Sequence, residues 1–142
     1  MRYKKTFFFI CKCLTINYSE KNKVLVENDL KSGNIDWETV VKISTNHLVF
    51  PALYCNLKRA NFLPYLPTDL VEFMKHITDL NRERNEQIIV EAKEINELLI
   101  ANNITPIFLK GTGNLMEGLY EDIAERMVGD IDLLISIDQL HK

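Results

Sequence analysis

Residues 105–135 read TPIFLKGTGNLMEGLYEDIAERMVGDIDLLI, and this stretch decides the fold class. The apolar runs at 106–109 and 131–135 are short and bounded by proline, glycine or charged residues, which is typical of buried strands. Residues 114–120 carry apolar side chains at helical spacing, and the glycine-rich segment 111–113 is predicted to be the turn before this helix. The stretch therefore predicts a strand, a turn, a helix and a second strand.

The chain before this stretch follows helical patterns. Asp36 is predicted to cap a helix that extends to Leu48, and Pro51 is predicted to start the next one. The first residues imitate the charged and apolar parts of a secretory signal, but Lys12 interrupts the apolar run after a few residues. We therefore expect a buried first helix or strand rather than a leader.

A long helix is predicted between Thr68, as its N-cap, and Asn102-Asn103, which would end it. Its apolar residues step by threes and fours: Leu70, Phe73, Ile77, Leu80, Ile88, Ala92, Ile95 and Leu99. The acid-base run at 81–86 interrupts this stripe. We interpret that run as a solvated helix face with i,i+4 pairs rather than as a binding surface.

Together these patterns predict an α+β (α/β-like) fold. Residues 1–103 would form a helical N-terminal region packed on a small mixed sheet built from residues 104–142. The hydrophobic content of 46% over 142 residues is sufficient for a buried core. The formal net charge of -3 and the mixing of charges argue against strong general nucleic-acid binding, so any polyanion must be bound locally.

The sequence lacks the signals of several other protein classes. Charges break every apolar run before the roughly 18 to 20 residues needed to cross a bilayer, so we expect no membrane partner and a cytoplasmic location. The cysteines, Cys11, Cys13 and Cys55, are interpreted as reduced thiols because they form neither a CxxC pair nor an even set. The histidines do not have the spacing of zinc ligands.

Two aspartates give the first chemical signal. In an extended strand Asp130 and Asp132 lie on one face, where their carboxylates would repel unless a divalent cation neutralised them. Oxygen ligands of this kind suit magnesium. The motif is weak by itself, and the open alternative is that two surface aspartates flank the start of a strand.

The segment Lys110-Gly111-Thr112 gives the second signal. A glycine turn that leads into a helix exposes backbone N–H groups and the positive end of the helix dipole, which favour phosphate. Thr112 adds a hydroxyl and Lys110 adds a cation. The spacing matches neither the GxxxxGK[ST] phosphate loop nor the GxGxxG dinucleotide fingerprint, and a plain turn is the alternative interpretation.

Taken in order, Lys110-Gly111, Leu119-Tyr120, Arg126 and Asp130-Ile131-Asp132 resemble the uncharacterised nucleotidyltransferase family of the DNA polymerase beta-like nucleotidyltransferase superfamily. That superfamily places a Gly-Ser or Gly-Thr turn before a short helix and an Asp-x-Asp on the next strand. Lys110 and Arg126 match this branch in particular. The specific resemblance covers residues 104–137.

The resemblance implies that residues 104–142 are the N-terminal part of a nucleotidyltransferase core. Such an enzyme transfers a nucleoside monophosphate from a nucleoside triphosphate to an acceptor, here unknown, with Mg²⁺ or Mn²⁺. The implied catalytic and metal-binding residues are Asp130 and Asp132. The implied nucleotide-binding residues are Lys110, Gly111, Thr112 and Arg126.

Two points stay open in this interpretation. Lys110 or Arg126 would stabilise charge on the leaving pyrophosphate, but Arg126 could instead form a salt bridge with Asp130 or Glu125 that orders the loop. The superfamily also takes a third carboxylate from a later strand, whereas the only acid after Asp132 is Asp138, which is too close.

We therefore expect a core truncated at its C-terminal end and a chain that is incomplete as an enzyme. The alternative function is a non-catalytic helical interaction module with a degenerate nucleotide pocket. A regulatory small-molecule binder without transfer chemistry is a third possibility.

Overall fold

A computed structural model describes residues 2–139. The helices are α1 (Arg2–Cys13), α2 (Glu20–Lys31), α3 (Trp37–Asn46), α4 (Phe50–Arg59), α5 (Thr68–Ala101) and α6 (Lys110–Met116). The short 3₁₀ helices and strands are η1 (Leu63–Tyr65), β1 (Ile107–Phe108), η2 (Ile123–Glu125), β2 (Leu133–Leu134) and η3 (Ile137–Gln139). The chain divides into two compact units, residues 1–79 and 80–142, which we call the first and the second unit, and their boundary falls inside α5.

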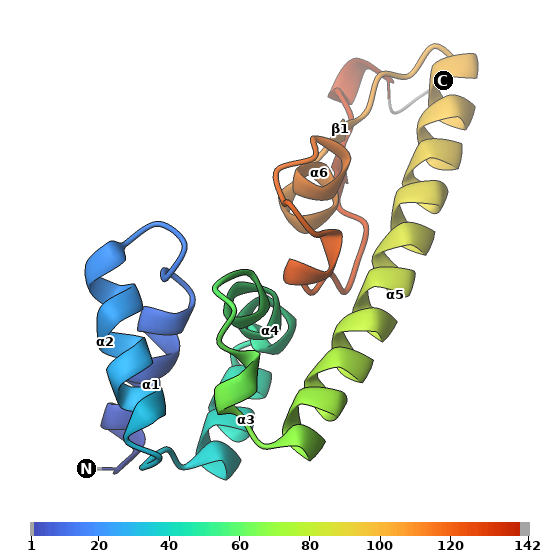
Figure 1. Cartoon of the computed structure of the whole chain (residues 1–142). Helices are drawn as coiled ribbons and strands as arrows, with labels where there is room; N and C mark the ends of the chain where they lie inside the picture. Colours follow the sequence, from blue (N-terminus) through green and yellow to red (C-terminus); the bar gives the residue numbers. More distant parts are fainter. Residues whose placement is uncertain (1, 140–142) are drawn as a thin grey trace. The chain divides into compact units, whose positions relative to one another are not determined.

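The first unit packs α1 to α4 and the beginning of α5 around an apolar core, with α1 beside α2 (Figure 1). Asp36 caps α3 as predicted, since its carboxylate accepts a hydrogen bond from the Thr39 N–H at 3.1 Å. Pro51 lies in the first turn of α4, where its missing N–H costs no helical hydrogen bond. The most deeply buried apolar side chains of the core are Ile16, Val26, Val40, Ile43, Leu53, Leu57 and Met74.

The predicted buried first element is the helix α1, which places Phe9, Ile10 and Cys13 in this core. All three cysteines are free: Cys13 and Cys55 are buried and Cys11 is exposed. Burial raises the pKa of the Cys13 thiol far above its ordinary value. The thiol therefore stays protonated and behaves as a small apolar residue.

The helix α5 begins and ends close to its predicted limits. After its last turn Asn103 adopts a left-handed conformation with a φ of 57°, and the Ile104 N–H reaches back to the Leu99 carbonyl at 2.9 Å. This is a Schellman-type end, which asparagine tolerates better than most residues. Across residues 2–139, no helix combines the length and the apolar character needed to span a membrane.

The buried face of α5 differs from the predicted stripe. Its buried positions step by fours and threes: Met74, Thr78, Asn81, Asn85, Ile88 and Ala92. Phe73 and Leu80, which the apolar pattern places on that face, are 47% and 48% exposed. The interpretation of residues 81–86 as a solvated face is therefore wrong for Asn81 and Asn85, because polar side chains occupy two positions of the buried stripe.

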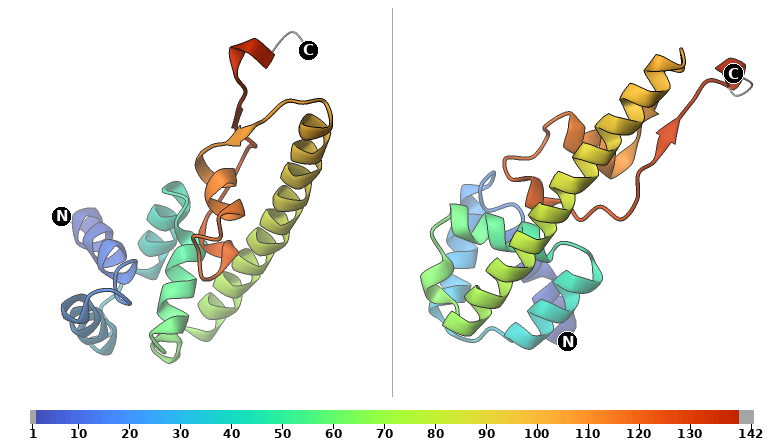
Figure 2. Two further views of the ribbon diagram at one scale, coloured as in Figure 1. Left: turned by 90° about the horizontal axis from the view of Figure 1, so that it is seen from above. Right: turned by 90° about the vertical axis from the view of Figure 1, so that its right-hand side faces the viewer.

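Both predicted strands are present, but each is shorter than its apolar run. β1 pairs with β2 antiparallel, with Phe108 opposite Leu133, and the Leu109 N–H donates to the Asp132 carbonyl at 2.9 Å. The α+β class agrees with the prediction, whereas the sheet described within residues 2–139 is a single antiparallel pair rather than a mixed sheet. Figure 2 shows the segment after α5 running back beside the second half of that helix.

The segment 111–113 does not form the predicted turn. α6 begins at Lys110, so these residues make its first turn. The change of direction falls on Lys110 itself, whose φ of 51° is left-handed. α6 ends at Met116, earlier than predicted, because Gly118 adopts a φ of 67° directly after the last turn.

Candidate functional site

The paired ends of β1 and β2 bring a lysine and two aspartates together. The Nζ of Lys110 lies 3.0 Å from Oδ2 of Asp132. This hydrogen bond and the charge of the Asp132 carboxylate raise the pKa of Lys110 above its ordinary value, and the charge of Asp130 adds a smaller effect in the same direction. Both carboxylates therefore act on the same cationic group.

Thr112 connects α6 to the aspartate segment. Its side chain is buried, and its hydroxyl donates a hydrogen bond to the backbone carbonyl of Asp130 at 2.9 Å. A threonine hydroxyl has one proton, which is committed to this bond. Thr112 thus positions Asp130, and the nucleotide-binding role expected for Thr112 stays a prediction.

Gly111 and Gly113 allow close approaches, to a side chain at Gly111 and to the backbone at Gly113. A Cβ atom at Gly113 would lie 2.6 Å from the Phe108 carbonyl oxygen, and one at Gly111 would lie 2.9 Å from a methyl group of Val128. Glycine is therefore needed for α6 to pack at this distance from β1. The same position at Gly111 is 3.6 Å from Nε of Arg126, so the Arg126 side chain lies beside the start of α6.

Two asparagines that the sequence interpretation missed hold the loop that carries Arg126. Asn85 donates hydrogen bonds from Nδ2 to the carbonyls of Ile123 and Arg126 at 2.6 and 2.7 Å. Asn81, one turn earlier on α5, donates to the carbonyls of Ala124 and Arg126 at 2.8 and 3.1 Å. We call this pair the asparagine clamp, and it fixes the backbone of Arg126 against α5.

A signal for the asparagine clamp was present in the sequence. Asn81 and Asn85 continue the three- and four-residue steps between Thr78 and Ile88, so the stripe could have been followed through polar positions. The clamp also has a cost. Oδ1 of Asn85 is buried without a hydrogen-bond partner within residues 2–139, and the donated bonds must offset the loss of its hydration.

An ion pair and a capping box order the same loop. Arg82 binds the Asp122 carboxylate through Nε at 3.1 Å and through Nη2 at 2.8 Å. Asp122 caps η2, and its own N–H donates to Oε1 of Glu125 at 3.3 Å. The Arg126 side chain forms no ion pair in the described part of the chain, so the alternative salt bridge to Glu125 or Asp130 is absent there.

A cavity of about 360 Å³ borders Asp130. α5 contributes Arg84, Gln87 and Ile88 to its wall, and the segment 129–131 forms another part. Nη2 of Arg84 donates a hydrogen bond to the Gly129 carbonyl at 3.4 Å, so the Arg84 guanidinium lies at the edge of this cavity. The volume is at the lower end of the range for small-molecule sites.

The residues that could hold a hard divalent cation are Asp130 and Asp132. Both aspartates offer carboxylate oxygens as ligands. The Lys110 ammonium binds the Asp132 carboxylate where a metal ion would bind it. Within residues 2–139 no group of three His, Cys, Asp or Glu side chains could hold a metal ion. Magnesium commonly binds to one or two carboxylates and completes its shell with water and substrate phosphates, which agrees with this pair.

Comparison with known proteins gives one match. The model of an uncharacterised nucleotidyltransferase family matches residues 33–142, which is more than half of the chain and includes every predicted site residue. No curated protein and no solved structure matches the chain. The resemblance inferred from the sequence motifs is confirmed at the level of the family. The chain belongs to this uncharacterised nucleotidyltransferase family.

Proposed function

We propose that the second unit binds a nucleoside triphosphate together with Mg²⁺ or Mn²⁺ and acts in the transfer of a nucleoside monophosphate to an acceptor. The observation that carries this proposal is the ion pair between Lys110 and Asp132 where β1 and β2 pair, with Asp130 near enough for its charge to act on the same lysine. Membership of the nucleotidyltransferase family supports the class of reaction.

In this proposal Arg126 and Lys110 bind the triphosphate. The guanidinium of Arg126 lies beside Gly111 and has no ion pair within the described residues, so it is available for phosphate oxygens. Lys110 is held by Asp132 in the absence of ligand. It can turn to the phosphates once a divalent cation neutralises that carboxylate. The cavity that borders Asp130 offers space for other parts of the substrate.

Asp130 and Asp132 would hold the metal ion. When bound, such an ion neutralises phosphate charge and supports attack by an acceptor hydroxyl. Thr112 fixes the backbone of Asp130, and the asparagine clamp fixes the backbone of Arg126. The backbones that carry the Asp130 carboxylate and the Arg126 guanidinium are therefore fixed before ligand binds, which matters because small misplacements cost much of a rate enhancement.

A second candidate function is nucleotide binding without transfer. The observation that favours it is that no group of three His, Cys, Asp or Glu side chains within residues 2–139 could hold a metal ion, so a third carboxylate does not join Asp130 and Asp132. Clamping both the attacking and the leaving oxygen of a phosphoryl group is typically the work of a two-metal site. Two carboxylates suffice to hold one ion, so binding is the more robust expectation.

Pyrophosphate release separates the two candidates. The full chain is incubated with each nucleoside triphosphate labelled at the γ-phosphate, which leaves in the pyrophosphate, with Mg²⁺ or Mn²⁺, and with water and the protein itself as acceptors. We expect release slower than about 1 per second. Asp132→Asn should reduce it at least about 100-fold, because even loss of a residue that orients a ligand costs about that much. Asp138→Asn, at an exposed position in η3, is the matched control.

The assay distinguishes nucleotide transfer from nucleotide binding without transfer. If the chain binds nucleotide in titration calorimetry but releases no pyrophosphate, the non-catalytic function is favoured. Equal release by the wild-type chain and by Asp132→Asn rejects the proposed site.

A further inference from the structure

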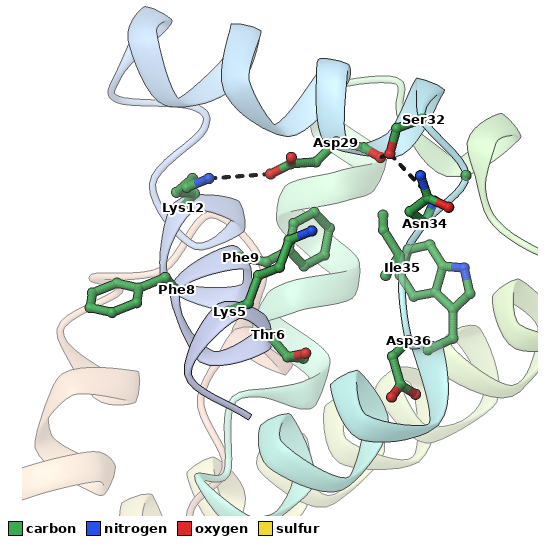
Figure 3. Close-up of a pocket in the computed structure, with 12 residues that line it drawn as sticks. Lys5, Thr6, Phe8, Phe9, Lys12, Asp29, Ser32, Asn34, Ile35 and Asp36 are labelled. Carbon is green, nitrogen blue, oxygen red and sulfur yellow. Dashed lines mark hydrogen bonds and ion pairs between the residues drawn. The ribbon is translucent and has the colours of Figure 1, made fainter. Parts of the chain in front are cut away.

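A second cavity, of about 770 Å³, lies in the first unit between α1, α2 and the segment that leads into α3 (Figure 3). Its volume is within the range of sites that enclose small-molecule ligands. The walls contributed by α1 and α2 precede residue 33, where the family match begins. Membership of the family therefore does not account for this cavity.

One wall of the cavity is aromatic. Phe9 is buried, and its ring packs edge-on against Trp37 with 6.2 Å between the ring centroids. Figure 3 shows Lys5 and Phe9 extending from α1 toward the segment that carries Ile35, whereas Phe8 points away from them. A flat apolar ring of a ligand would pack favourably on this wall, because aromatic edges and faces attract one another.

Two lysines and two aspartates line the cavity, so its formal charge is balanced, and within the described residues the lysine without a partner is Lys5. Nζ of Lys12 lies 3.2 Å from Oδ2 of Asp29, so these two groups neutralise each other. The carboxylate of Asp36 caps α3, where the helix dipole favours a negative charge. The ammonium of Lys5 lines the same space and has neither an ion pair nor a hydrogen bond within residues 2–139.

We propose that this cavity binds a small molecule with a flat apolar ring system and one acidic group, the ring against Phe9 and Trp37 and the acid on Lys5. Lys5 is exposed and hydrated without a ligand, so an acid on the ring would replace water with a charge-assisted contact. A polyanion would meet the carboxylates of Asp29 and Asp36. The lining therefore selects for a single negative charge next to an apolar body.

The only tryptophan of the chain, Trp37, lies in this lining, so its fluorescence reports on the cavity. The probes are 8-anilinonaphthalene-1-sulfonate and N-phenyl-1-naphthylamine, which share one ring system with and without the acid. We expect the sulfonate to quench Trp37 by energy transfer and to bind about three- to tenfold more tightly than the neutral probe, because it forms a charge-assisted contact.

Substitutions of neighbouring lysines test the contact. Lys5→Gln should abolish the preference for the sulfonate, and Lys5→Arg should keep it. Lys4→Gln removes the same charge from an adjacent exposed position outside the lining and should leave the preference unchanged. Equal affinities for the two probes, or equal effects of Lys5→Gln and Lys4→Gln, would overturn the proposal. Saturation with the sulfonate probe without energy transfer from Trp37 would overturn it as well.

Discussion

The two units of the chain are stabilised in different ways. The first unit buries an extended apolar cluster that includes Leu53 and Leu57. In the second unit, the buried apolar cluster within the described residues consists of Ile88, Leu115 and Val128. Since hydrophobic stabilisation scales with the buried apolar area, the first unit has the larger share of it.

The second unit adds hydrogen bonds from buried polar side chains to backbone carbonyls of distant segments, whereas the buried Ser44, Asn56 and Thr78 of the first unit donate such bonds within their own helices. Asn81 and Asn85 hold the loop at Arg126, and Thr112 holds the carbonyl of Asp130. Apolar packing is non-directional, whereas a hydrogen bond specifies a distance and an angle. The first unit therefore depends mainly on apolar packing, whereas directional hydrogen bonds in the second unit fix the backbones of Arg126 and Asp130.

The largest effect on stability is expected from the truncation of a buried side chain in the core of the first unit. Leu53 is fully buried, and Leu53→Ala should lower the free energy of unfolding by about 2 to 5 kcal/mol, because the removed methyl groups leave a void. Urea denaturation followed by Trp37 fluorescence measures the change. Leu25→Ala, at a position that is 38% exposed, is the control. A loss below about 1 kcal/mol for Leu53→Ala would contradict an apolar origin of the stability of this unit.

A smaller loss is expected from overpacking in the second unit. Gly113→Ala places a methyl group 2.6 Å from the Phe108 carbonyl oxygen, which belongs to the backbone and cannot turn aside. The substitution should cost about 1 to 3 kcal/mol of unfolding free energy and displace α6 from β1. Gly129→Ala is the matched control, because a methyl group there meets no atom within 4 Å. Equal stability of both variants would show that the close approach is not required.

Removing half of the asparagine clamp should have a more moderate effect. Asn85→Ala deletes two hydrogen bonds, while Asn81 still binds the Arg126 carbonyl. We expect a loss of about 1 to 2 kcal/mol in unfolding free energy and weaker nucleotide binding. Asn96→Ala changes an asparagine of α5 that makes no side-chain hydrogen bond within the described residues. If both variants behave alike, the clamp does not position Arg126.

The smallest effect is expected from the charge of Lys110. In the proposed site this ammonium would compete with a metal ion for Asp132. Lys110→Gln should therefore tighten Mn²⁺ binding about three- to fivefold in the absence of nucleotide, as expected for one exposed charge at short range. The same variant should weaken binding of Mn²⁺ with a nucleoside triphosphate, because it removes a phosphate contact. Electron paramagnetic resonance of free Mn²⁺ measures both affinities.

The pH dependence of this competition follows from the direction of the pKa shift. The folded protein raises the pKa of Lys110, so the ion pair is complete below its ordinary value of 10.5 and is lost as the pH rises through the raised value. Titrations near neutral pH therefore include the full competition. Lys93→Gln, on the exposed surface of α5, is the control. The same change of Mn²⁺ affinity in both variants would contradict a specific role of Lys110.

Local features could be predicted from the sequence because they depend on neighbouring residues. The Asp36 cap, the helix start at Pro51 and the end of α5 at Asn103 all follow from side chains within a few positions. The motif residues also come together: Lys110 contacts Asp132, and Thr112 contacts the Asp130 backbone. The chemical roles of these residues remain predictions.

Contacts between distant residues could not be predicted in the same way. Asn81 and Asn85 look solvated because they are polar, and their partners in the loop at Arg126 lie about forty positions later in the chain. The composition of residues 111–113 favours a turn. Their glycines are instead explained by packing against Phe108 and Val128, which no local pattern reports.

Asp130 and Asp132 are proposed to form one metal and nucleotide site. Titration calorimetry of the full chain with non-hydrolysable nucleoside triphosphate analogues, with and without Mg²⁺, tests it most directly. We predict binding that requires the metal, that persists in Asp138→Asn, and that disappears in the double variant Asp130→Asn, Asp132→Asn, which keeps the shape of both side chains and removes their charge. Unchanged metal-dependent binding in the double variant would contradict the account.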